Sequence, residues 1–559
     1  MASHAGLKQP LVMAGAVGDC VHVVGVSRFL RLAGEAGYRT IFLGPAVDPV
    51  DFARAVERER PDLVGVSYRL TPEAAGRVLE LFGRELEARL AKTGWRPRLV
   101  FGGTPPVARV AARSGLFEAV FDGTEGDEAV LAWLRGRPLE AAPTAYPETL
   151  VERVRAQAPF PLIRHHYGRP SYRETLEGVA AIAESRAVDV ISLGVDQNTQ
   201  EHFFHPEERD PRQEGAGGVP VHSPEEFRAL YQASRRGNFP LMRSYSGTRD
   251  ILRMAEVLRE TIHLAWGAVP LTWYSVLDGR SRRSLEETIR EAQAAFAWHG
   301  AHGIPLESNE AHHWSLRDAP DSVAVAMAFL AAYNARAAGV RTYVAQFMFN
   351  TPPGTSFTMD LAKMLAKAEL IESLEGDGFT VLRETRAGLT SMPADLDAAR
   401  GHLGATTLLQ MALRPQIVHV VAPVEADHAA TARDVIEAAR LARGVIRDAL
   451  DGLPAMAVDP NVQARRDELV QEAMILLEAI RSVADPGVAD PWADATTLAR
   501  AVHVGLIDAP QLRGNPEARG EVVTRLVDGA CRAVDPETGE PLSESERVRR
   551  LLDQALRAV

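Results

Sequence analysis

Cysteine is nearly absent from this chain: among 559 residues only Cys20 and Cys531 occur. Two thiols cannot build a disulfide framework. They also cannot supply the set of thiolates that holds an iron–sulfur cluster. We therefore expect no radical enzyme built on such a cluster and S-adenosylmethionine. Scarce cysteine fits a reducing compartment, so we expect a cytoplasmic protein.

Other absences exclude further classes of protein. The net charge is −12 and no block of lysine and arginine stands out, which argues against a nucleic-acid partner. No run of about 18 apolar residues occurs, so we expect no membrane partner. The first ten residues lack a charged segment followed by an apolar one, and we therefore expect no signal peptide.

The length and the pattern of apolar runs predict several α/β domains. Alternating strand and helix patterns over 1–138 predict a doubly wound, flavodoxin-like sheet. Residues 139–159 are rich in proline and alanine and predict a linker. About eight strand–helix units over 160–454, with one strand expected at Pro270–Val276, predict a (β/α)8 barrel of the TIM type. Residues 455–559 predict a mostly helical extension.

Three short motifs follow strands of the N-terminal domain. Asp19, His22 and Gly25 follow the first strand, Ser67 to Leu70 follows the third, and Gly102-Gly103-Thr104 follows the fourth. The carboxyl ends of parallel strands share one edge, where such sheets bind ligands. A neutral imidazole is a good ligand for a transition metal. Glycines let the backbone approach a bulky ligand closely.

These motifs resemble the cobalamin-binding module of adenosylcobalamin mutases and methionine synthase, which carries Asp-x-His-x-x-Gly, Ser-x-Leu and Gly-Gly. The resemblance covers roughly residues 10–135. It implies that His22 binds cobalt and that Asp19 supports the imidazole as a hydrogen-bond partner. Asp19 stands three residues before His22 where the family has two, and Leu70 also comes one residue late. The resemblance implies the cofactor-binding residues Asp19, His22, Gly25, Ser67, Leu70, Gly102, Gly103 and Thr104.

The remainder of the chain distantly resembles the large subunit of methylaspartate (glutamate) mutase. The likeness rests on Pro240 to Thr248, His402 to Pro423 and Val504 to Pro510. It implies an adenosylcobalamin-dependent radical isomerase, a carbon-skeleton mutase with its cobalamin module fused at the N-terminus. In that family a barrel mouth capped by the corrinoid module keeps water away from the radical.

The same resemblance implies site residues in the barrel. Arg243 matches an arginine that grips a substrate carboxylate, Tyr274 matches a family tyrosine, and Glu425 falls where the family contacts the adenosyl ribose or the substrate. From its place after the fifth strand, Glu310 is a candidate acid or base. Other family positions are not kept, so we expect a small acid other than glutamate itself. These positions are Gln200, Ala268 and Asp278.

Several alternatives stay open at this point. The alternative interpretation of His22 is an ordinary histidine at the start of a helix. Two alternative functions are those of a corrinoid-dependent methyltransferase and of a cobalamin-binding protein without catalysis. An aminomutase that uses pyridoxal phosphate needs a Schiff-base lysine, and the barrel offers only Lys363 and Lys367, on a predicted outer helix. We also expect a homo-oligomer, most simply a dimer.

Overall fold

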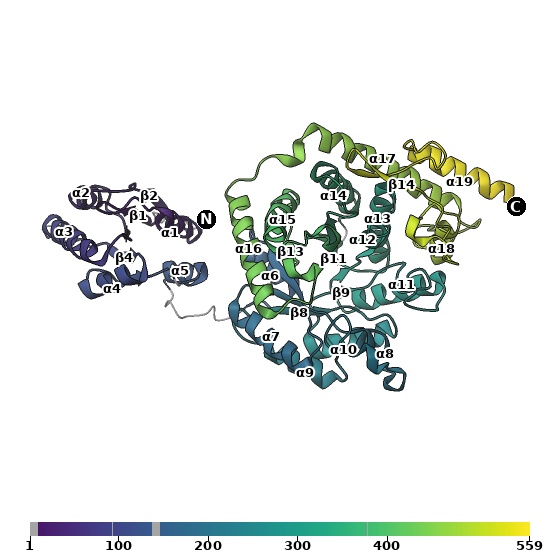
Figure 1. Cartoon of the computed structure of the whole chain (residues 1–559), viewed down its shortest axis with the longest axis horizontal. Helices are drawn as coiled ribbons and strands as arrows, with labels where there is room; N and C mark the ends of the chain where they lie inside the picture. The colour runs from purple at the N-terminus through teal and green to yellow at the C-terminus, as the bar shows by residue number, and fades with distance from the viewer. Residues whose placement is uncertain (1–8, 92, 124, 137–145, 377, 559) are drawn as a thin grey trace, which may run out of the picture. The chain divides into compact units, whose positions relative to one another are not determined.

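The computed structural model describes residues 9–91, 93–123, 125–136, 146–376 and 378–558. The chain divides into two compact units, Met1–Ala145 and Tyr146–Val559. Each unit has its own hydrophobic core. Figure 1 shows the strands and helices of both units. None of the helices in the described ranges has the length and apolar character needed to cross a bilayer.

The N-terminal unit is a five-stranded parallel sheet in the order β2-β1-β3-β4-β5. This is the flavodoxin-like order, in which a ligand crevice forms at the carboxyl ends of the strands. The interior strand β1 is buried along nearly its whole length, as expected for a strand covered on both faces. The elements are β1 (Leu11–Ala16), α1 (Val24–Glu35), β2 (Arg39–Phe42), α2 (Pro49–Glu59), β3 (Leu63–Ser67), α3 (Pro72–Leu90), β4 (Arg98–Gly102), α4 (Pro105–Ser114), β5 (Ala119–Phe121) and α5 (Asp127–Leu134).

The second unit contains a nearly closed barrel of eight parallel strands. Its sheet order, β8-β7-β6-β13-β12-β11-β10-β9, is the order of the chain read around a ring. The gap between β8 and β9 is bridged where the Ala265 N–H donates to the Met242 carbonyl at 2.9 Å. The strands are β6 (Leu162–Tyr167), β7 (Val190–Leu193), β8 (Leu241–Ser244), β9 (Gly267–Ala268), β10 (Leu306–Glu307), β11 (Thr342–Phe349), β12 (Thr380–Ala387) and β13 (Ile417–Val420).

Helices surround the barrel strands, as Figure 1 shows. Together with the two sheets, they confirm the predicted α/β fold class. The helices of this region are α6 (Leu150–Gln157), α7 (Tyr172–Ser185), α8 (Gln197–His202), α9 (Pro224–Ala233), α10 (Ile251–Ile262), α11 (Leu285–Ala301), α12 (Glu310–Ser315), α13 (Asp321–Ala337), α14 (Phe357–Glu372), α15 (Leu396–Gln410) and α16 (Ala432–Asp451). Short 3-10 turns lie at Pro206–Glu208, Pro211–Gln213, Leu389–Ser391, Met411–Leu413 and Pro423–Ala426.

One predicted strand is wrong in this unit. Pro270–Val276 is a loop, and the fourth strand is the short β9 instead. The backbone of Tyr274 has φ of 68°, in the left-handed region that an extended strand cannot include. Within the predicted linker, α6 forms a helix whose Leu150 is buried beneath the barrel strands. Part of that linker, 139–145, lies outside the described residues.

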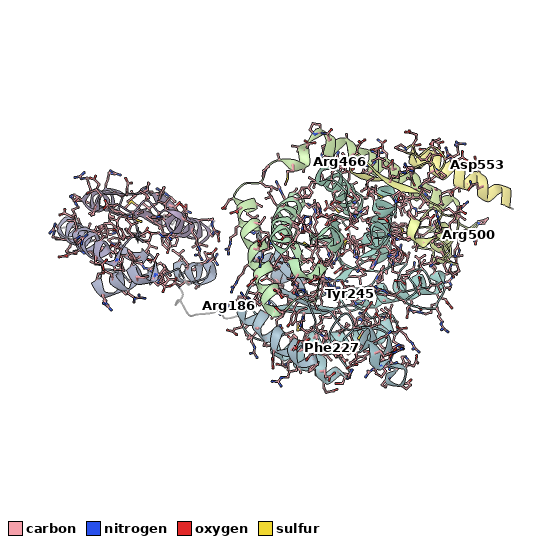
Figure 2. The ribbon with its side chains drawn as sticks, viewed as in Figure 1. Arg186, Phe227, Tyr245, Arg466, Arg500 and Asp553 are labelled. Carbon is pink, nitrogen blue, oxygen red and sulfur yellow. The ribbon has the colours of Figure 1, made fainter. Side chains whose placement is uncertain are left out.

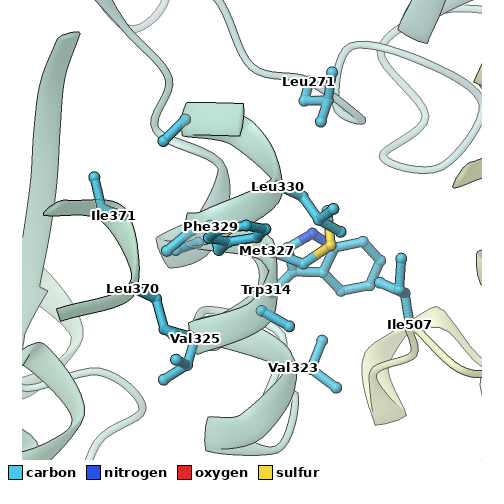
Figure 3. Packing of buried hydrophobic residues seen from close by; sticks show 14 of the residues in the cluster. Leu271, Trp314, Val323, Val325, Met327, Phe329, Leu330, Leu370, Ile371 and Ile507 are labelled. Carbon is cyan, nitrogen blue, oxygen red and sulfur yellow. The ribbon is translucent and has the colours of Figure 1, made fainter. Parts of the chain in front are cut away.

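The C-terminal extension packs onto the barrel. Figure 3 shows Ile507 against Trp314 and Met327 of the barrel core. Asp321 at the start of α13 accepts from the Cys531 N–H at 3.1 Å and lies 3.2 Å from Lys363 Nζ. The extension is mostly helical but also contains an antiparallel hairpin. Its elements are Met456–Val458 (3-10), α17 (Pro460–Ser482), α18 (Ala495–His503), Pro510–Leu512 (3-10), β14 (Thr524–Val527), β15 (Ala530–Ala533) and α19 (Glu544–Ala558).

Candidate functional site

The N-terminal unit has a cavity of about 340 Å³ at the carboxyl edge of its sheet. It opens where β1, β3 and β4 end and where α1 begins. The sequence motifs converge on it, although they come from three separate strand ends. Of the predicted residues, the lining contains His22, Gly25, Ser67, Gly102, Gly103 and Thr104.

Two predicted cofactor residues do not join this lining. Leu70 is 42% exposed and Asp19 is also exposed, and neither lines the cavity. The Nδ1 atom of His22 instead lies 4.0 Å from the Sγ of buried Cys20. Among the described residues, no carboxylate lies within ion-pairing distance of the His22 ring. The extra residue between Asp19 and His22 gives the physical reason, because it places Cys20 beside the ring.

The glycines of the cavity test whether a large ligand fits. A Cβ atom built on Gly102 or on Gly25 has no other atom within 4 Å. The space next to these two glycines, on the side of the cavity, is therefore open. Gly103 has another role: its Cβ would lie 2.6 Å from the Tyr68 carbonyl oxygen, so close packing requires glycine there. An exposed imidazole beside an open, glycine-lined cavity is suited to hold a bulky cofactor through a metal–nitrogen bond.

Inside the barrel, charged side chains form a fully buried network around Arg164. Its Nη1 contacts Glu307 Oε2 at 3.1 Å and also pairs with Glu384. Its Nε donates to Ser192 Oγ at 2.8 Å. Burial opposes the charge on Arg164, but the two glutamates outweigh burial and raise its pKa. The network thus places charge in the barrel interior, where apolar layers are the usual filling.

Arg243 lies in the same interior with part of its guanidinium unused. Its Nη1 lies 3.5 Å from Glu307 Oε2, and the guanidinium stacks over the rings of Tyr245 and Trp266. Its Nε and Nη2 have no hydrogen-bond partner although the residue is inaccessible to solvent. Buried donors without partners are costly, so these two N–H groups are suited to bind a ligand carboxylate.

Further polar groups lie next to this network, at the ends of β6, β8, β12 and β13. Tyr245 OH lies 3.0 Å from His166 Nε2, and the rings of His166 and His419 are 4.7 Å apart. Figure 2 places Tyr245 at the centre of the barrel unit, among converging side chains. Burial lowers the pKa of both histidines well below their usual value, so both rings are neutral. Arg386 makes no ion pair with any described residue and adds a positive charge to those of Arg164 and Arg243.

The other predicted barrel residues are placed differently from expectation. Glu310 is not free to act as an acid or base, because its oxygens accept from the Leu271 and Thr272 N–H groups, the Thr272 hydroxyl and Trp314 Nε1. It holds the loop after β9 in place. Tyr274 lies in that loop, buried, and burial raises its pKa.

Glu425 accepts from the Ala422 N–H at 2.8 Å, and its Oε1 lies 3.3 Å from His165 Nε2. The two lysines expected on an outer helix surface are buried in α14. Lys363 donates to the Thr351 carbonyl at 2.6 Å, and burial lowers the pKa of Lys367 to about 7.

Sequence reasoning pointed to Arg164 and Glu307 only as strand-end residues without an assigned role, and it missed Glu384 and Arg386. Arg164, Glu307, Glu384 and Arg386 lie within strands, where charged residues are exceptional. A charged residue in an otherwise apolar barrel strand was the available signal. Separately, His205, Glu207 and Glu208 bring ligand atoms within 4.8 Å of one another, but both glutamates are exposed and water can satisfy them.

Comparison with known proteins gives one informative match. None of the curated proteins matches the chain. Two solved structures of the cobalamin-dependent S-adenosylmethionine radical enzyme OxsB align with it. The apo, selenomethionine-labelled form is 11% identical, with 86% of this chain and 69% of that one covered; the form with aqua-cobalamin and S-adenosylmethionine is 11% identical, with 99% and 81% covered. Both TM-scores are 0.18, so these likenesses support no argument about fold or chemistry.

The informative match is to a family model. Residues 10–131 match the family described as the B12 binding domain. This range ends within α5 and spans the cavity with His22, Ser67 and the Gly102-Gly103 pair. The N-terminal unit is thus a flavodoxin-like B12-binding domain.

Proposed function

We propose that the chain is an adenosylcobalamin-dependent isomerase, a carbon-skeleton mutase that acts on a small carboxylate-bearing substrate other than glutamate. The observation that carries the proposal is the unpartnered, fully buried N–H face of Arg243 in a barrel fused to a B12-binding domain. Such a face fits a carboxylate, and a B12-binding domain fits radical rearrangement of the acid held there. The resemblance to methylaspartate mutase favours isomerisation over methyl transfer.

In the N-terminal unit, His22 would hold the cobalt, and the open sides of Gly25 and Gly102 would make room for the cofactor. Bound adenosylcobalamin supplies an organic radical through its weak cobalt–carbon bond. The nearby Cys20 Sγ, at 4.0 Å from His22 Nδ1, takes the place where the family uses a carboxylate. A thiol is a weak hydrogen-bond partner, so Cys20 would hold the His22 ring less firmly than a carboxylate does.

In the barrel, the protein's own residues bind the acid and exclude water. Arg243 would grip one carboxylate through Nε and Nη2, with its orientation fixed by Tyr245, Trp266 and Glu307. Arg386 offers a second positive charge, and the neutral His166 can exchange hydrogen bonds without adding charge. A dry interior strengthens these interactions and keeps a reactive radical from solvent.

The test uses the full chain reconstituted with adenosylcobalamin. A spectrum of base-off cobalamin with a histidine ligand is expected, and His22→Ala should lose it while the exposed neighbour variant Val21→Ala keeps it. A panel of small acids is then screened by electron paramagnetic resonance for a cobalt-coupled radical pair. A radical pair that Arg243→Met abolishes supports the proposal. Methyl transfer without any radical signal contradicts isomerisation and favours a corrinoid methyltransferase.

A further inference from the structure

Two glutamates flank Arg164 in the barrel, yet only one of them is fully hydrogen-bonded. Glu307 Oε1 accepts from Gln346 Nε2 at 3.0 Å, and its Oε2 accepts from Trp266 Nε1 at 2.7 Å and from Arg164. Glu384 uses Oε1 for Arg164, but its Oε2 has no partner although the side chain is inaccessible to solvent. The difference sets Glu384 apart as the carboxyl group with an unused oxygen.

A carboxylate oxygen buried without a donor is costly, and a proton on that oxygen removes the cost. Burial raises the pKa of Glu384 from 4.5 to about 8, while the nearby Arg164 opposes the rise. At neutral pH the Oε2 atom is then a hydroxyl that can donate a hydrogen bond. The titratable and charged groups that face Glu384 are Arg164 and His166 of β6, Tyr245 after β8, Glu307 of β10, Arg386 of β12 and His419 of β13.

Arg243 and Glu384 belong to strands on opposite sides of the barrel. Their strands, β8 and β12, are four places apart in a ring of eight, so they lie on opposite sides. Arg164 and Glu307 connect them, because Arg243 Nη1 lies 3.5 Å from Glu307 and Arg164 contacts both glutamates. One wall therefore offers two free N–H groups and the opposite wall offers one free carboxyl oxygen.

We propose that Arg243 and a protonated Glu384 bind the two ends of one ligand, so that the barrel selects a 2-oxo acid over the 2-amino acid of the same skeleton. A carbonyl oxygen accepts from the Glu384 hydroxyl. An ammonium group needs an ionised carboxylate there, and at pH 7 deprotonating a group with a pKa of about 8 costs about tenfold in affinity. The inference rests on the proposed function only in taking the ligand to be a small acid.

The experiment is isothermal titration calorimetry of the full chain with 2-oxoglutarate and with L-glutamate, from pH 6.5 to 9.5. We expect 2-oxoglutarate to bind at least about tenfold more tightly at pH 7, and its affinity to fall above pH 8. In Glu384→Gln the amide still donates, so 2-oxoglutarate should bind with most of its affinity but without that fall. Glu177→Gln is the control, since Glu177 is an exposed glutamate paired with Arg173 outside the barrel network, and this variant should keep both the affinity and the pH dependence.

Each outcome decides the inference. L-Glutamate binding as tightly as 2-oxoglutarate at pH 7, or an oxo-acid affinity that stays constant to pH 9.5, would overturn it and leave the proposed acid substrate standing. Binding of neither acid would overturn this inference, whereas the proposed function is decided separately by the radical-pair screen with other small acids. If Glu384→Gln fails to fold by circular dichroism, the wild-type pH series still decides, because it needs no variant.

Discussion

The two units build their sites from different materials. In the B12-binding domain, the cavity is shaped by backbone at strand ends and by glycines, and the proposed cobalt ligand His22 is exposed. In the barrel, the site is a network of buried side chains from distant strands, centred on Arg164. A site made of backbone tolerates most side-chain changes and fails at a few glycines. A site made of buried charges depends on every partner.

The largest expected effect lies in the barrel. Arg164→Met removes the cation between Glu307 and Glu384 and leaves both carboxyl groups buried without it. Removing one partner of a buried ion pair typically costs about 3–5 kcal/mol. Differential scanning calorimetry should show a lower transition for the barrel and an unchanged cobalamin titration of the N-terminal unit. The exposed Arg173→Ala is the control, and an equal loss there would contradict the distinction between the two sites.

The pH dependence of stability should also belong to the barrel. The folded-state pKa of Glu384 is raised to about 8 from 4.5, so the folded protein holds this proton more tightly than the unfolded chain. Stability is then present below pH 4.5 from this group and is lost as pH rises toward 8, by up to about 1.4 kcal/mol per pH unit. Thermal unfolding from pH 5 to 9 should show this slope, and Glu384→Gln should flatten it. A slope that survives in Glu384→Gln would assign the titration to another group.

In the N-terminal unit, the matched pair is Gly103→Ala and Gly102→Ala. A Cβ at Gly103 would lie 2.6 Å from the Tyr68 carbonyl oxygen and 2.8 Å from the Phe101 ring. Overpacking of this kind costs about 1–3 kcal/mol, which urea unfolding of the variant should detect.

Gly102→Ala should have the smallest effect on folding, within about 0.5 kcal/mol, because its Cβ meets no atom within 4 Å. Its methyl group would instead point into the open space beside the cavity, so we expect weaker cobalamin binding, measured by absorbance titration. Equal unfolding midpoints for the two glycine variants would show that Gly103 is not a packing position.

The sequence was informative where site residues belong to short motifs at strand ends. It was less informative where site residues come from distant strands. The strand-end motifs predicted six of the lining residues of the cavity, since strand ends in a parallel sheet meet whatever lies between them. Asp19 was expected to be the hydrogen-bond partner of His22. Because of the one extra residue between them, Cys20 instead lies beside the His22 ring. Glu310 was expected to act as an acid or base. A carboxylate near a strand end can equally hold a loop by accepting from backbone N–H groups, and Glu310 does so with Leu271 and Thr272.

The barrel was predictable as an architecture, from eight alternations of strand and helix, although the fourth strand was expected at Pro270–Val276 and is instead β9. Its charged centre was not predictable, because Arg164, Glu307 and Glu384 are separated by more than a hundred and by nearly eighty residues along the chain. Only closure of the ring brings them into contact. A single sequence without the fold does not say which strand faces which.

Asp321 links the C-terminal hairpin to the barrel. It receives the Cys531 N–H from the C-terminal hairpin and touches Lys363, which in turn donates to the Thr351 carbonyl in the loop after β11. The C-terminal hairpin is therefore connected through Asp321 and Lys363 to the loop that follows β11. A chimera that exchanges the C-terminal extension between related chains would have to exchange Asp321, Lys363 and that loop together with it.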